Sequence, residues 1–320
     1  MNRIIDVFNG DADGLCALHQ LRLAAPADSI LVTGPKRDIS LLRRVQAQAG
    51  DRITVLDVAL SKNRAAVDAA LAAGASIRYF DHHQPGEIPV HPGFEAHIDT
   101  SPETCTSLLV NDYLDGAHLV WAVAAAFGDN LAQAARLAAR PLGLNERQLG
   151  QLQELGECLN YNGYGETLED LHYAPDELYR IVHRYRDPFE LIASEPAFRV
   201  LREGFAQDMA HAGSAKPEVD RPSGRIFILP AEKWARRISG VLGNRLAEDS
   251  HAQAHAVLTR KPEGGFVVSV RAPLSGKAGA DEICSQFETG GGRKGAAGIN
   301  HLPEADYDRF VSLFYSVYKG

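Results

Sequence analysis

Residues 8–18 read FNGDADGLCAL and come at the end of the apolar run RIIDVF. Asp11 and Asp13 stand two positions apart in this stretch, and glycines flank the pair. One aspartate between a strand and a helix is commonly a helix N-cap, because its carboxylate accepts hydrogen bonds from the first backbone N–H groups. Two aspartates that face the same way repel each other unless a positive charge lies between them. The stretch therefore predicts a strand-to-helix junction of an α/β fold that holds a cation.

The first hundred residues alternate short β-type runs with helical runs. The expected strands are residues 3–8, 29–34, 52–58, 76–82 and 95–99. Between them, apolar residues recur at helical spacing in residues 14–25, 38–50 and 61–74. Strands that alternate with helices of this length predict a parallel sheet with helices on both faces. In such sheets the loops at the carboxyl ends of the strands carry the chemistry.

The remainder of the chain has two further parts. A mostly helical stretch is expected at about residues 103–195. Residues 206–225 are rich in Pro, Gly, Ser and charged side chains, and we interpret them as a linker. The pattern after it is α+β, with several short strands and helices. The sequence thus predicts an α/β domain with a helical extension over 1–205 and a smaller α+β domain over 226–320.

Composition limits the class of protein. The 320 residues are 45% hydrophobic and 23% charged, which is typical of a globular protein with a core. No apolar run is long enough to span a membrane, and the early Asp6 argues against a signal peptide, so we expect a cytoplasmic protein. The net charge of −8 argues against coating of long DNA, although a metal ion would still permit a small anionic substrate. The four scattered cysteines are expected to be reduced and buried.

Acidic and histidine side chains follow several of the expected strands. Asp11 and Asp13 follow the first strand, and Asp57 ends the third. The fourth strand ends in Asp81, His82 and His83, and Asp129 closes an apolar helix. Each residue taken alone has an ordinary structural explanation, such as a helix cap or a surface position. Together they place carboxylates and imidazoles at one edge of one sheet, where they would repel each other strongly without a cation.

Oxygen and imidazole ligands without a thiolate suit Mn²⁺ or Mg²⁺. If one carboxylate bridges, two such ions can hold a phosphoryl group and activate a water molecule. We therefore expect one or two divalent ions at this edge, and a reaction at phosphorus.

The order of these motifs resembles a known superfamily. The string DADG, an isolated strand-end Asp, the triplet DHH and a later Asp are similar to the DHH phosphoesterases, which include RecJ-type exonucleases and nanoRNases. In the second half, SVRAP and the Gly-rich run GGGRKGAAGIN resemble the DHHA1 domain. The resemblance covers most of the chain, least clearly residues 130–220. It implies a DHH domain followed by a substrate-binding DHHA1 domain.

The resemblance also implies roles for individual residues. The implied metal ligands are Asp11, Asp13, Asp57, His82 and Asp129, with Asp57 bridging. His83 matches a histidine that contacts the phosphate and helps to protonate the leaving group. Asp81 matches a residue that orients the histidines, a function that carboxylates commonly perform beside metal-bound imidazole.

Two positions depart from the family pattern. Many members have a ligating His at the position of Val7, and RecJ-type members have an Asp at the position of Asn9. Val7 cannot ligate a metal and an amide oxygen is a weaker ligand, so one of two metal sites is expected to be weak or to be filled only when substrate is bound. In the Gly-rich run, Arg293 stands where the family has His. An arginine still recognises phosphate, but it does not transfer a proton at neutral pH.

The second domain is expected to hold the substrate. Three consecutive glycines let a backbone approach an anion closely. The expected substrate contacts are His83, Arg271, Gly290, Gly291, Gly292, Arg293 and Lys294. Lys36 and Arg37, after the second strand, are further candidates for phosphate contacts, and the Tyr and His residues of 160–188 are weaker candidates for base stacking.

The sequence favours a Mn²⁺-dependent phosphohydrolase that acts on a small nucleotide. Short oligonucleotides, dinucleotides and nucleoside bisphosphates all fit, and the mechanism would use a metal-activated water. Val7 and Asn9 motivate an alternative, a catalytically degenerate member that binds a nucleotide without cleaving it. Neither a membrane nor long DNA is an expected partner, and a homodimer is left open.

Overall fold

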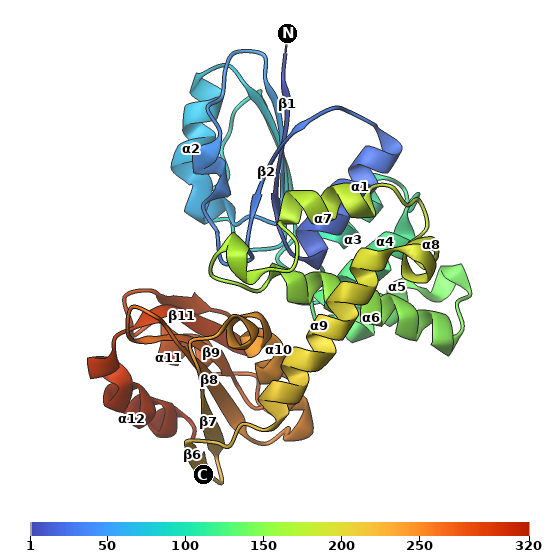
Figure 1. Ribbon diagram of the computed structural model, residues 1–320. Helices are drawn as coiled ribbons and strands as arrows, with labels where there is room; N and C mark the ends of the chain where they lie inside the picture. Colours follow the sequence, from blue (N-terminus) through green and yellow to red (C-terminus); the bar gives the residue numbers. More distant parts are fainter. Residues whose placement is uncertain (1, 320) are drawn as a thin grey trace. The chain divides into compact units, whose positions relative to one another are not determined.

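The computed structural model describes residues 2–319, and the chain divides into two compact units, Met1–Glu203 and Gly204–Gly320 (Figure 1). The first unit contains a five-stranded sheet in the order β2-β1-β3-β4-β5, and every neighbouring pair is parallel. Its strands are β1 Ile4–Asn9, β2 Ile30–Gly34, β3 Arg52–Leu56, β4 Ser76–Asp81 and β5 Phe94–Ile98. The five strands expected from the sequence are confirmed, with small shifts at their ends.

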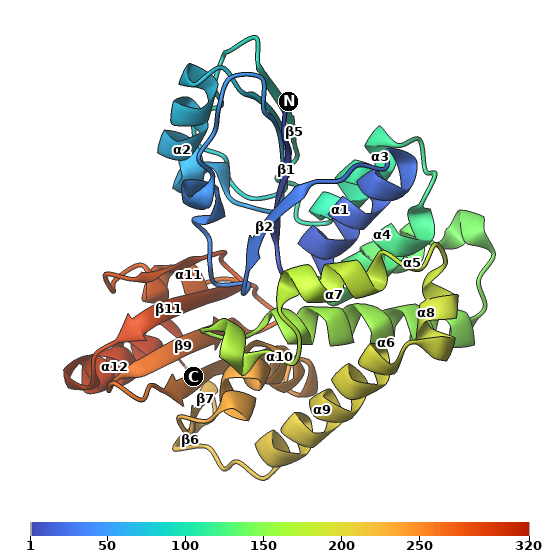
Figure 2. The ribbon, with the colours of Figure 1, turned by 45° about the horizontal axis from the view of Figure 1, so that its top comes forward.

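Helices cover both faces of this sheet, as the pattern predicted. Helix α2 (Leu60–Ala72) and the 3₁₀ helix η1 (Leu41–Arg44) pack on one face, where Val7, Val55 and Tyr79 are fully buried. Helices α1 (Ala12–Ala24) and α3 (Thr106–Tyr113) lie on the opposite face (Figure 2). Side chains of successive strand residues point to opposite faces, so both faces of the central strands are apolar and buried.

The expected helical extension follows β5. Helix α4, VWAVAAAFG in its core, is buried along most of its length and packs against α1, α3 and α6. The helices after α3 are α4 Leu119–Gly128, α5 Ala132–Ala138, α6 Glu146–Gly163, α7 Pro175–Val182, α8 Pro188–Ser194 and α9 Pro196–Gly213, with short 3₁₀ helices η2 Arg140–Leu142 and η3 Leu168–Asp170. The burial of α4 explains its composition, because a helix surrounded by other helices is apolar on all sides.

Two expectations from the sequence are wrong. Residues 38–50 form only the short helix η1 and irregular chain, because Asn63 accepts a hydrogen bond from the N–H of Leu42 and donates one to the carbonyl of Ile39. Residues 206–225 are not an irregular linker, since residues 206–213 continue helix α9 and the rest includes β6 and the start of β7. The second expectation rested on polar composition alone. Residues 206–225 are polar because they form the end of a surface helix and a strand at the edge of a sheet.

The second unit is an α+β domain, as expected, built on a mixed six-stranded sheet in the order β10-β11-β9-β8-β7-β6. Its elements are β6 Val219–Arg221, β7 Gly224–Leu229, α10 Lys233–Asp249, β8 Ala254–Arg260, β9 Phe266–Arg271, α11 Ala280–Cys284, β10 Gly290–Gly292, β11 Ala296–Leu302, η4 Glu304–Asp306 and α12 Tyr307–Val317. Helices α11 and α12 pack on one face through Ile283, Phe310 and Phe314. The Gly-rich run is a β-hairpin rather than only a turn, because β10 pairs with β11.

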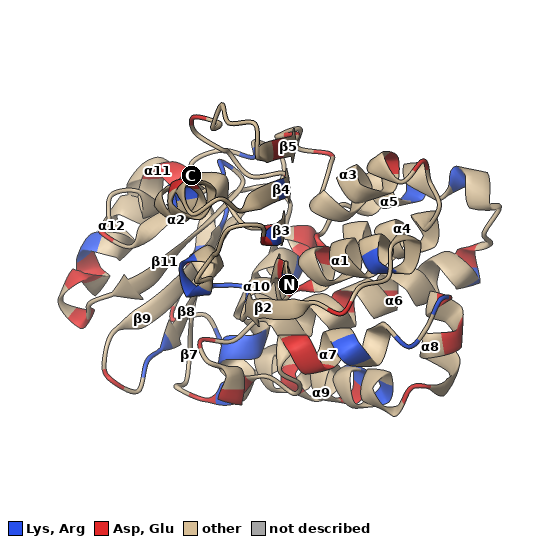
Figure 3. Ribbon diagram, turned by 90° about the horizontal axis from the view of Figure 1, so that it is seen from above, with Lys and Arg blue, Asp and Glu red and all other residues tan. Residues whose placement is uncertain are grey.

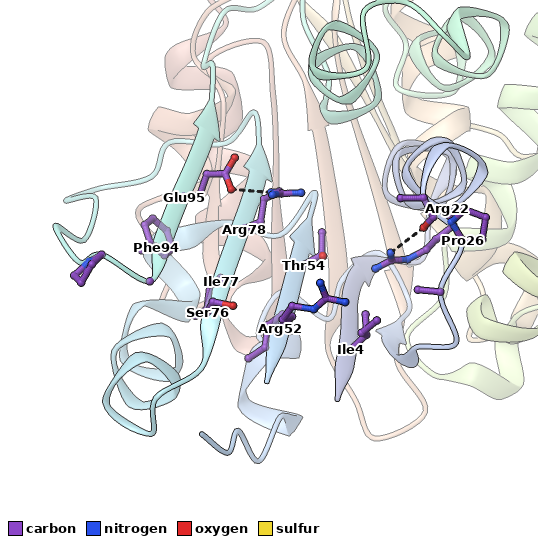
Figure 4. A pocket seen from close by; sticks show the side chains of 15 residues that line it. Ile4, Arg22, Pro26, Arg52, Thr54, Ser76, Ile77, Arg78, Phe94 and Glu95 are labelled. Atoms are coloured by element: carbon purple, nitrogen blue, oxygen red, sulfur yellow. Dashed lines mark hydrogen bonds and ion pairs between the residues drawn. The ribbon is translucent and has the colours of Figure 1, made fainter. Parts of the chain in front are cut away.

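The amino-terminal ends of the first sheet line a pocket (Figure 4). Arg52, Thr54 and Arg78 project into it from neighbouring strands, and Arg78 pairs with Glu95 at 2.8 Å. At its other side, Arg22 of α1 forms an ion pair with the fully buried Asp6 of β1 at 2.6 Å. This pair fixes α1 on the sheet, and therefore fixes the loop that precedes α1 at the opposite edge.

Among residues 2–319, no helix combines the length and apolar character needed to cross a membrane. The four cysteines are free and buried, as expected.

Candidate metal centre

Acidic and histidine side chains meet at the carboxyl edge of the first sheet. Strands β1, β3 and β4 are parallel neighbours in register, so the loops after them lie side by side. These loops carry the carboxylates and histidines that the sequence singled out, and Asp129 joins them from the end of α4. Figure 3 shows acidic residues gathered beside the start of α1.

His82 occupies the middle of this group. Its Nε2 atom lies 3.3 Å from Oδ1 of Asp57, 3.8 Å from Oδ2 of Asp129 and 4.0 Å from Oδ2 of Asp13. Its Nδ1 atom lies 3.1 Å from the carbonyl oxygen of Thr104. A carbonyl only accepts, so Nδ1 carries the hydrogen and Nε2 is the nitrogen available to a metal.

Asp13 is held by the first turn of α3. The N–H groups of Thr106 and Ser107 donate to its two carboxylate oxygens at 2.7 Å each. The hydroxyl of Ser107 also donates to the backbone oxygen of Asp13. Asp13 is 1% exposed. These bonds orient the carboxylate, and each oxygen keeps a lone pair for a further partner.

Asp57 is placed by an uncommon backbone conformation. Its φ of 58° lies in the left-handed region, which Asp and Asn tolerate better than other residues with a side chain. Its N–H donates to the carbonyl of Phe80 at 3.0 Å, and the hydroxyl of Thr106 lies 3.4 Å from its Oδ1. The conformation turns the chain at the end of β3 and leaves the side chain among the other acids.

The carboxylates of this cluster are electrostatically strained. Burial, followed by the nearby charges of Asp11 and Asp13, raises the pKa of Asp57 well above its ordinary value. The pKa of Asp13 is also raised, mainly by burial, although His82 opposes the shift. A raised carboxyl pKa means that the ionised form is disfavoured, and a bound cation would reverse this.

Asp81 and His83 form a pair beside the cluster. Oδ1 of Asp81 accepts from Nδ1 of His83 at 2.7 Å and from the N–H of His82 at 2.9 Å. The His83 side chain is 37% exposed, so it is accessible to a substrate. Burial alone would lower the pKa of His83, but the hydrogen bond to Asp81 and the charge of Asp57 raise it.

Asp11 has different partners from the other acids. It caps helix α1, and its Oδ1 accepts from the N–H groups of Asp13 and Gly14 at 3.0 and 3.1 Å. Its Oδ2 lies 2.6 Å from Nζ of Lys36. Burial would raise the pKa of Asp11, but the charge of Lys36 lowers it.

The donor set fits a divalent ion. Two overlapping groups of side chains have ligand atoms within 4.8 Å of one another, Asp57, His82 and His83 in one and Asp13, His82 and Asp129 in the other. Asp11 belongs to neither group. Buried carboxylates with raised pKa and an imidazole nitrogen form a hard-ligand site of the kind that Mn²⁺ and Mg²⁺ use.

Except for His83, the expected substrate contacts belong to the second unit. Arg271 of β9 is paired with Ala296, the first residue of β11, and β11 is the second strand of the Gly-rich hairpin. The first strand and the turn of that hairpin contain Gly290, Gly291, Gly292, Arg293 and Lys294. The Arg271 guanidinium donates to Asn244, Ser269 and two backbone carbonyls. These bonds hold Arg271 in place against α10, and its contact with a substrate stays a prediction.

Sequence reasoning missed the partners of Lys36. The lysine was a candidate for a phosphate contact, but its Nζ also lies 3.5 Å from Asp129 and 3.2 Å from Oδ1 of Asn160. Asn160 and Tyr164, which lies under the ammonium, come from the end of α6 and its cap. No local pattern links residues more than a hundred positions apart, so only the fold could bring them together.

No protein-family model matches the chain, and no curated protein matches its sequence. Solved structures do match the fold. A DHH-domain protein described as a member of a family of ribosomal proteins superposes with a TM-score of 0.66 at 15% identity, covering 98% of this chain and 86% of that one.

The chain has the fold of the DHH superfamily. A manganese-bound exonuclease RecJ superposes with a TM-score of 0.60 at 18% identity, covering 98% of this chain and 89% of that chain. A pGpG-specific phosphodiesterase, PggH from Vibrio cholerae, gives a TM-score of 0.54 at 14% identity over 99% of both chains. The DHH fold therefore extends over both units, as the motif order predicted.

Proposed function

We propose that this chain is a divalent-metal-dependent phosphohydrolase that cleaves a phosphodiester or phosphomonoester bond of a small nucleotide. The observation that carries the proposal is the convergence of Asp13, Asp57 and Asp129 on Nε2 of His82. The structurally similar RecJ is described as an exonuclease bound to manganese, and PggH as a pGpG-specific phosphodiesterase. Both descriptions support phosphodiester chemistry for a protein with this fold.

Asp13, Asp57, His82 and Asp129 would hold the ion. A divalent ion there supplies Lewis acidity for the phosphoryl oxygens and lowers the pKa of water. His83 would bind a phosphoryl oxygen and give a proton to the leaving oxygen, with Asp81 keeping its Nδ1–H in a fixed direction. Because its pKa is raised, His83 stays protonated to a higher pH than a free histidine does.

The second unit would select the substrate. Arg271, Arg293 and Lys294 lie close to the exposed glycine hairpin and offer positive charge and backbone N–H groups to an anion. The net charge of −8 disfavours a long polyanion bound along the surface. A dinucleotide or short oligonucleotide places only a few phosphates in such a site, and it fits this charge distribution best.

The arrangement of the acidic and histidine side chains disfavours the alternative function, a protein that binds a nucleotide without cleaving it. Asp13, Asp57 and His82 are buried. Hydrogen bonds with Thr104, Thr106 and Ser107 orient His82 and Asp13. A protein that only bound nucleotide would gain nothing from buried carboxylates whose pKa values are raised.

Hydrolysis assays with Mn²⁺ test the proposal. The panel is a labelled dinucleotide, a pentanucleotide, a cyclic dinucleotide, an adenosine bisphosphate and pyrophosphate. Asp57→Asn is the test variant, because Asn tolerates the left-handed conformation at this position. Asp28→Asn is the matched control, since Asp28 is exposed in the loop before β2, at the opposite edge of the sheet.

Turnover that needs Mn²⁺, disappears in Asp57→Asn and persists in Asp28→Asn would support the phosphohydrolase. The preferred panel member would then name the substrate class. Nucleotide binding without turnover on any member, equal in all three proteins, would contradict the proposal and favour the binder.

A further inference from the structure

The buried Asp11 and the partly exposed Lys36 form an ion pair beside the candidate metal position. Both oxygens of Asp11 have partners, since Oδ1 accepts from the start of α1 and Oδ2 lies 2.6 Å from Nζ of Lys36. Asp11 shares no metal-binding group with the other acids. The carboxylate of Asp11, which the sequence resemblance implied as a metal ligand, is therefore already paired with a positively charged side chain of the protein.

The ammonium of Lys36 is surrounded by acceptors. Besides Asp11, it lies 3.2 Å from Oδ1 of Asn160 and 3.5 Å from Oδ1 of Asp129. An ammonium has three N–H donors, and three acceptors surround this one. The ring of Tyr164 lies 5.4 Å away and adds a cation–π contact. These groups together form a cation-binding site, and the lysine ammonium fills it.

A backbone hydrogen bond positions Lys36 beside Asp11. Its N–H donates to the carbonyl of Gly163 at 2.9 Å, which ties the loop after β2 to the end of α6. A Cβ atom at Gly163 would lie 2.9 Å from the Cβ of Asp11, so a glycine is needed there. The position of the lysine thus depends on contacts from three separate segments.

Asp129 connects the two cation positions. Its Oδ1 lies 3.5 Å from Nζ of Lys36, and its Oδ2 lies 3.8 Å from Nε2 of His82. A carboxylate that divides its oxygens in this way stabilises two neighbouring positive charges at once. In this chain, one of the charges is the ammonium and the other is the ion of the proposed function.

The strand residue four positions before Asp11 cannot bind a metal ion. Val7 is fully buried in the apolar core on the α2 face of the sheet. A valine offers no lone pair, so a second ion beside Asp11 would have fewer protein ligands than the ion beside His82.

We propose that the ammonium of Lys36 takes the place of a second metal ion, so that the centre holds one divalent ion, bound by Asp13, Asp57, His82 and Asp129. This inference rests on the proposed function for the presence of that ion. It replaces the expectation that Asp11 is a metal ligand. The ammonium of Lys36 is covalently part of the chain and cannot dissociate as a bound ion can. The centre therefore needs only one divalent ion to supply the remaining positive charge.

Mn²⁺ binding tests the inference without an activity assay. Equilibrium dialysis with metal analysis gives the number of ions per chain, and electron paramagnetic resonance shows whether bound Mn²⁺ ions are magnetically coupled. The variants are Lys36→Gln, which removes the charge, and Lys36→Arg, which retains it. Lys62→Gln is the matched control, because Lys62 is exposed on α2, on the opposite face of the sheet.

The expected result is one uncoupled ion per chain in the wild type, in Lys36→Arg and in Lys62→Gln. Lys36→Gln is expected to double the number to two, with a coupled signal. Two coupled ions in the wild type would overturn the inference and leave the phosphohydrolase intact, and this result does not depend on any variant folding. A single ion in folded Lys36→Gln would also overturn it. No bound ion in the wild type would contradict the proposed function as well.

Discussion

Nε2 of His82 lies 3.3 Å from Oδ1 of Asp57, and the two buried side chains come from the ends of adjacent parallel strands. The register of β3 and β4 sets this distance, because Leu56, one residue before Asp57, pairs with Phe80, two residues before His82. The contact defines the centre of the cluster. It also means that neither residue can be changed without altering the electrostatics of the other.

Asp57→Asn is expected to stabilise the metal-free protein at neutral pH and to abolish tight Mn²⁺ binding. Burial and the charges of Asp11 and Asp13 raise the pKa of Asp57 in the folded state. A raised carboxyl pKa gives stability that is present at low pH and is lost as the pH rises through the folded-state pKa. An asparagine at position 57 does not ionise, so the variant does not lose this stability as the pH rises.

Thermal unfolding in a chelator, measured from pH 4 to pH 8, checks this prediction. The difference in melting temperature between Asp57→Asn and wild type should grow as the pH rises, in favour of the variant. A variant that is less stable than wild type at pH 8 would show that the cluster is not strained.

Asp81→Asn is expected to lower activity while the protein still binds Mn²⁺. Asp81 positions His83 through the 2.7 Å hydrogen bond, and loss of such a partner typically costs roughly 10- to 100-fold in activity. The hydrogen bond to Asp81 also raises the pKa of His83 against the effect of burial. Without it, the alkaline limb of the pH–rate profile should move to lower pH.

The pH dependence of kcat in both proteins provides the measurement. A merely structural role for Asp81 would reduce kcat equally at every pH, whereas the positioning role shifts the profile. Asp99→Asn, at the end of the neighbouring strand β5, is a suitable control for a general loss of charge.

Arg22→Ala is expected to destabilise the protein by roughly 3–5 kcal/mol, because removal of one partner leaves a buried charge without compensation. The partner is Asp6, which is fully buried at 2.6 Å from the guanidinium. The double variant Asp6→Leu, Arg22→Met removes both charges and should recover most of the loss. Urea unfolding at pH 7 gives the free energy of unfolding of the wild type, the single variant and the double variant. Equal destabilisation in the single and double variants would mean that packing, and not charge, is decisive.

Gly292→Ala and Gly291→Ala are expected to differ in their effect on the second unit. Gly292 has φ 144°, and a Cβ there would lie 2.5 Å from the Cα of Ala297. The substitution should cost roughly 1–3 kcal/mol or more through backbone strain. A Cβ at Gly291 meets nothing within 4 Å, so its substitution should stay within about 0.5 kcal/mol.

Unfolding of the two variants tests the fold, and nucleotide binding tests the role of the hairpin. If the hairpin approaches a phosphate, Gly291→Ala weakens nucleotide binding without destabilising the protein. Unchanged binding in Gly291→Ala would argue that the glycine run serves only the packing of β10 against β11.

The sequence was sufficient for the strands of the first sheet and for the set of residues at its edge. Alternation of apolar strands and amphipathic helices allows few arrangements besides a parallel sheet, and the carboxyl ends of its strands then share an edge. Asp13, Asp57 and His82 were identified on that basis and Asp129 from the end of an apolar helix, and the structure places them together. Their roles as ligands stay predictions.

Local patterns failed where a segment is held by distant partners. Residues 38–50 contain apolar residues at helical spacing, yet Asn63 of α2 binds the backbone and limits the helix to four residues, Leu41–Arg44. In contrast, residues 206–213 were polar enough to suggest a linker, and they are helical. Helical propensity is a weak prior that tertiary contacts readily override.

The sequence by itself determined the parallel α/β class of the first unit and the chemical nature of the donors, because both follow from residue types and from periodicity along the chain. Only the tertiary structure decided which side chain each carboxylate meets. Asp11 and Asp13 are equivalent in the sequence, yet the fold places Lys36 against Asp11 and His82 near Asp13. Electrostatic energy depends on distances of a few ångströms between side chains far apart in the chain, and no local pattern contains those distances.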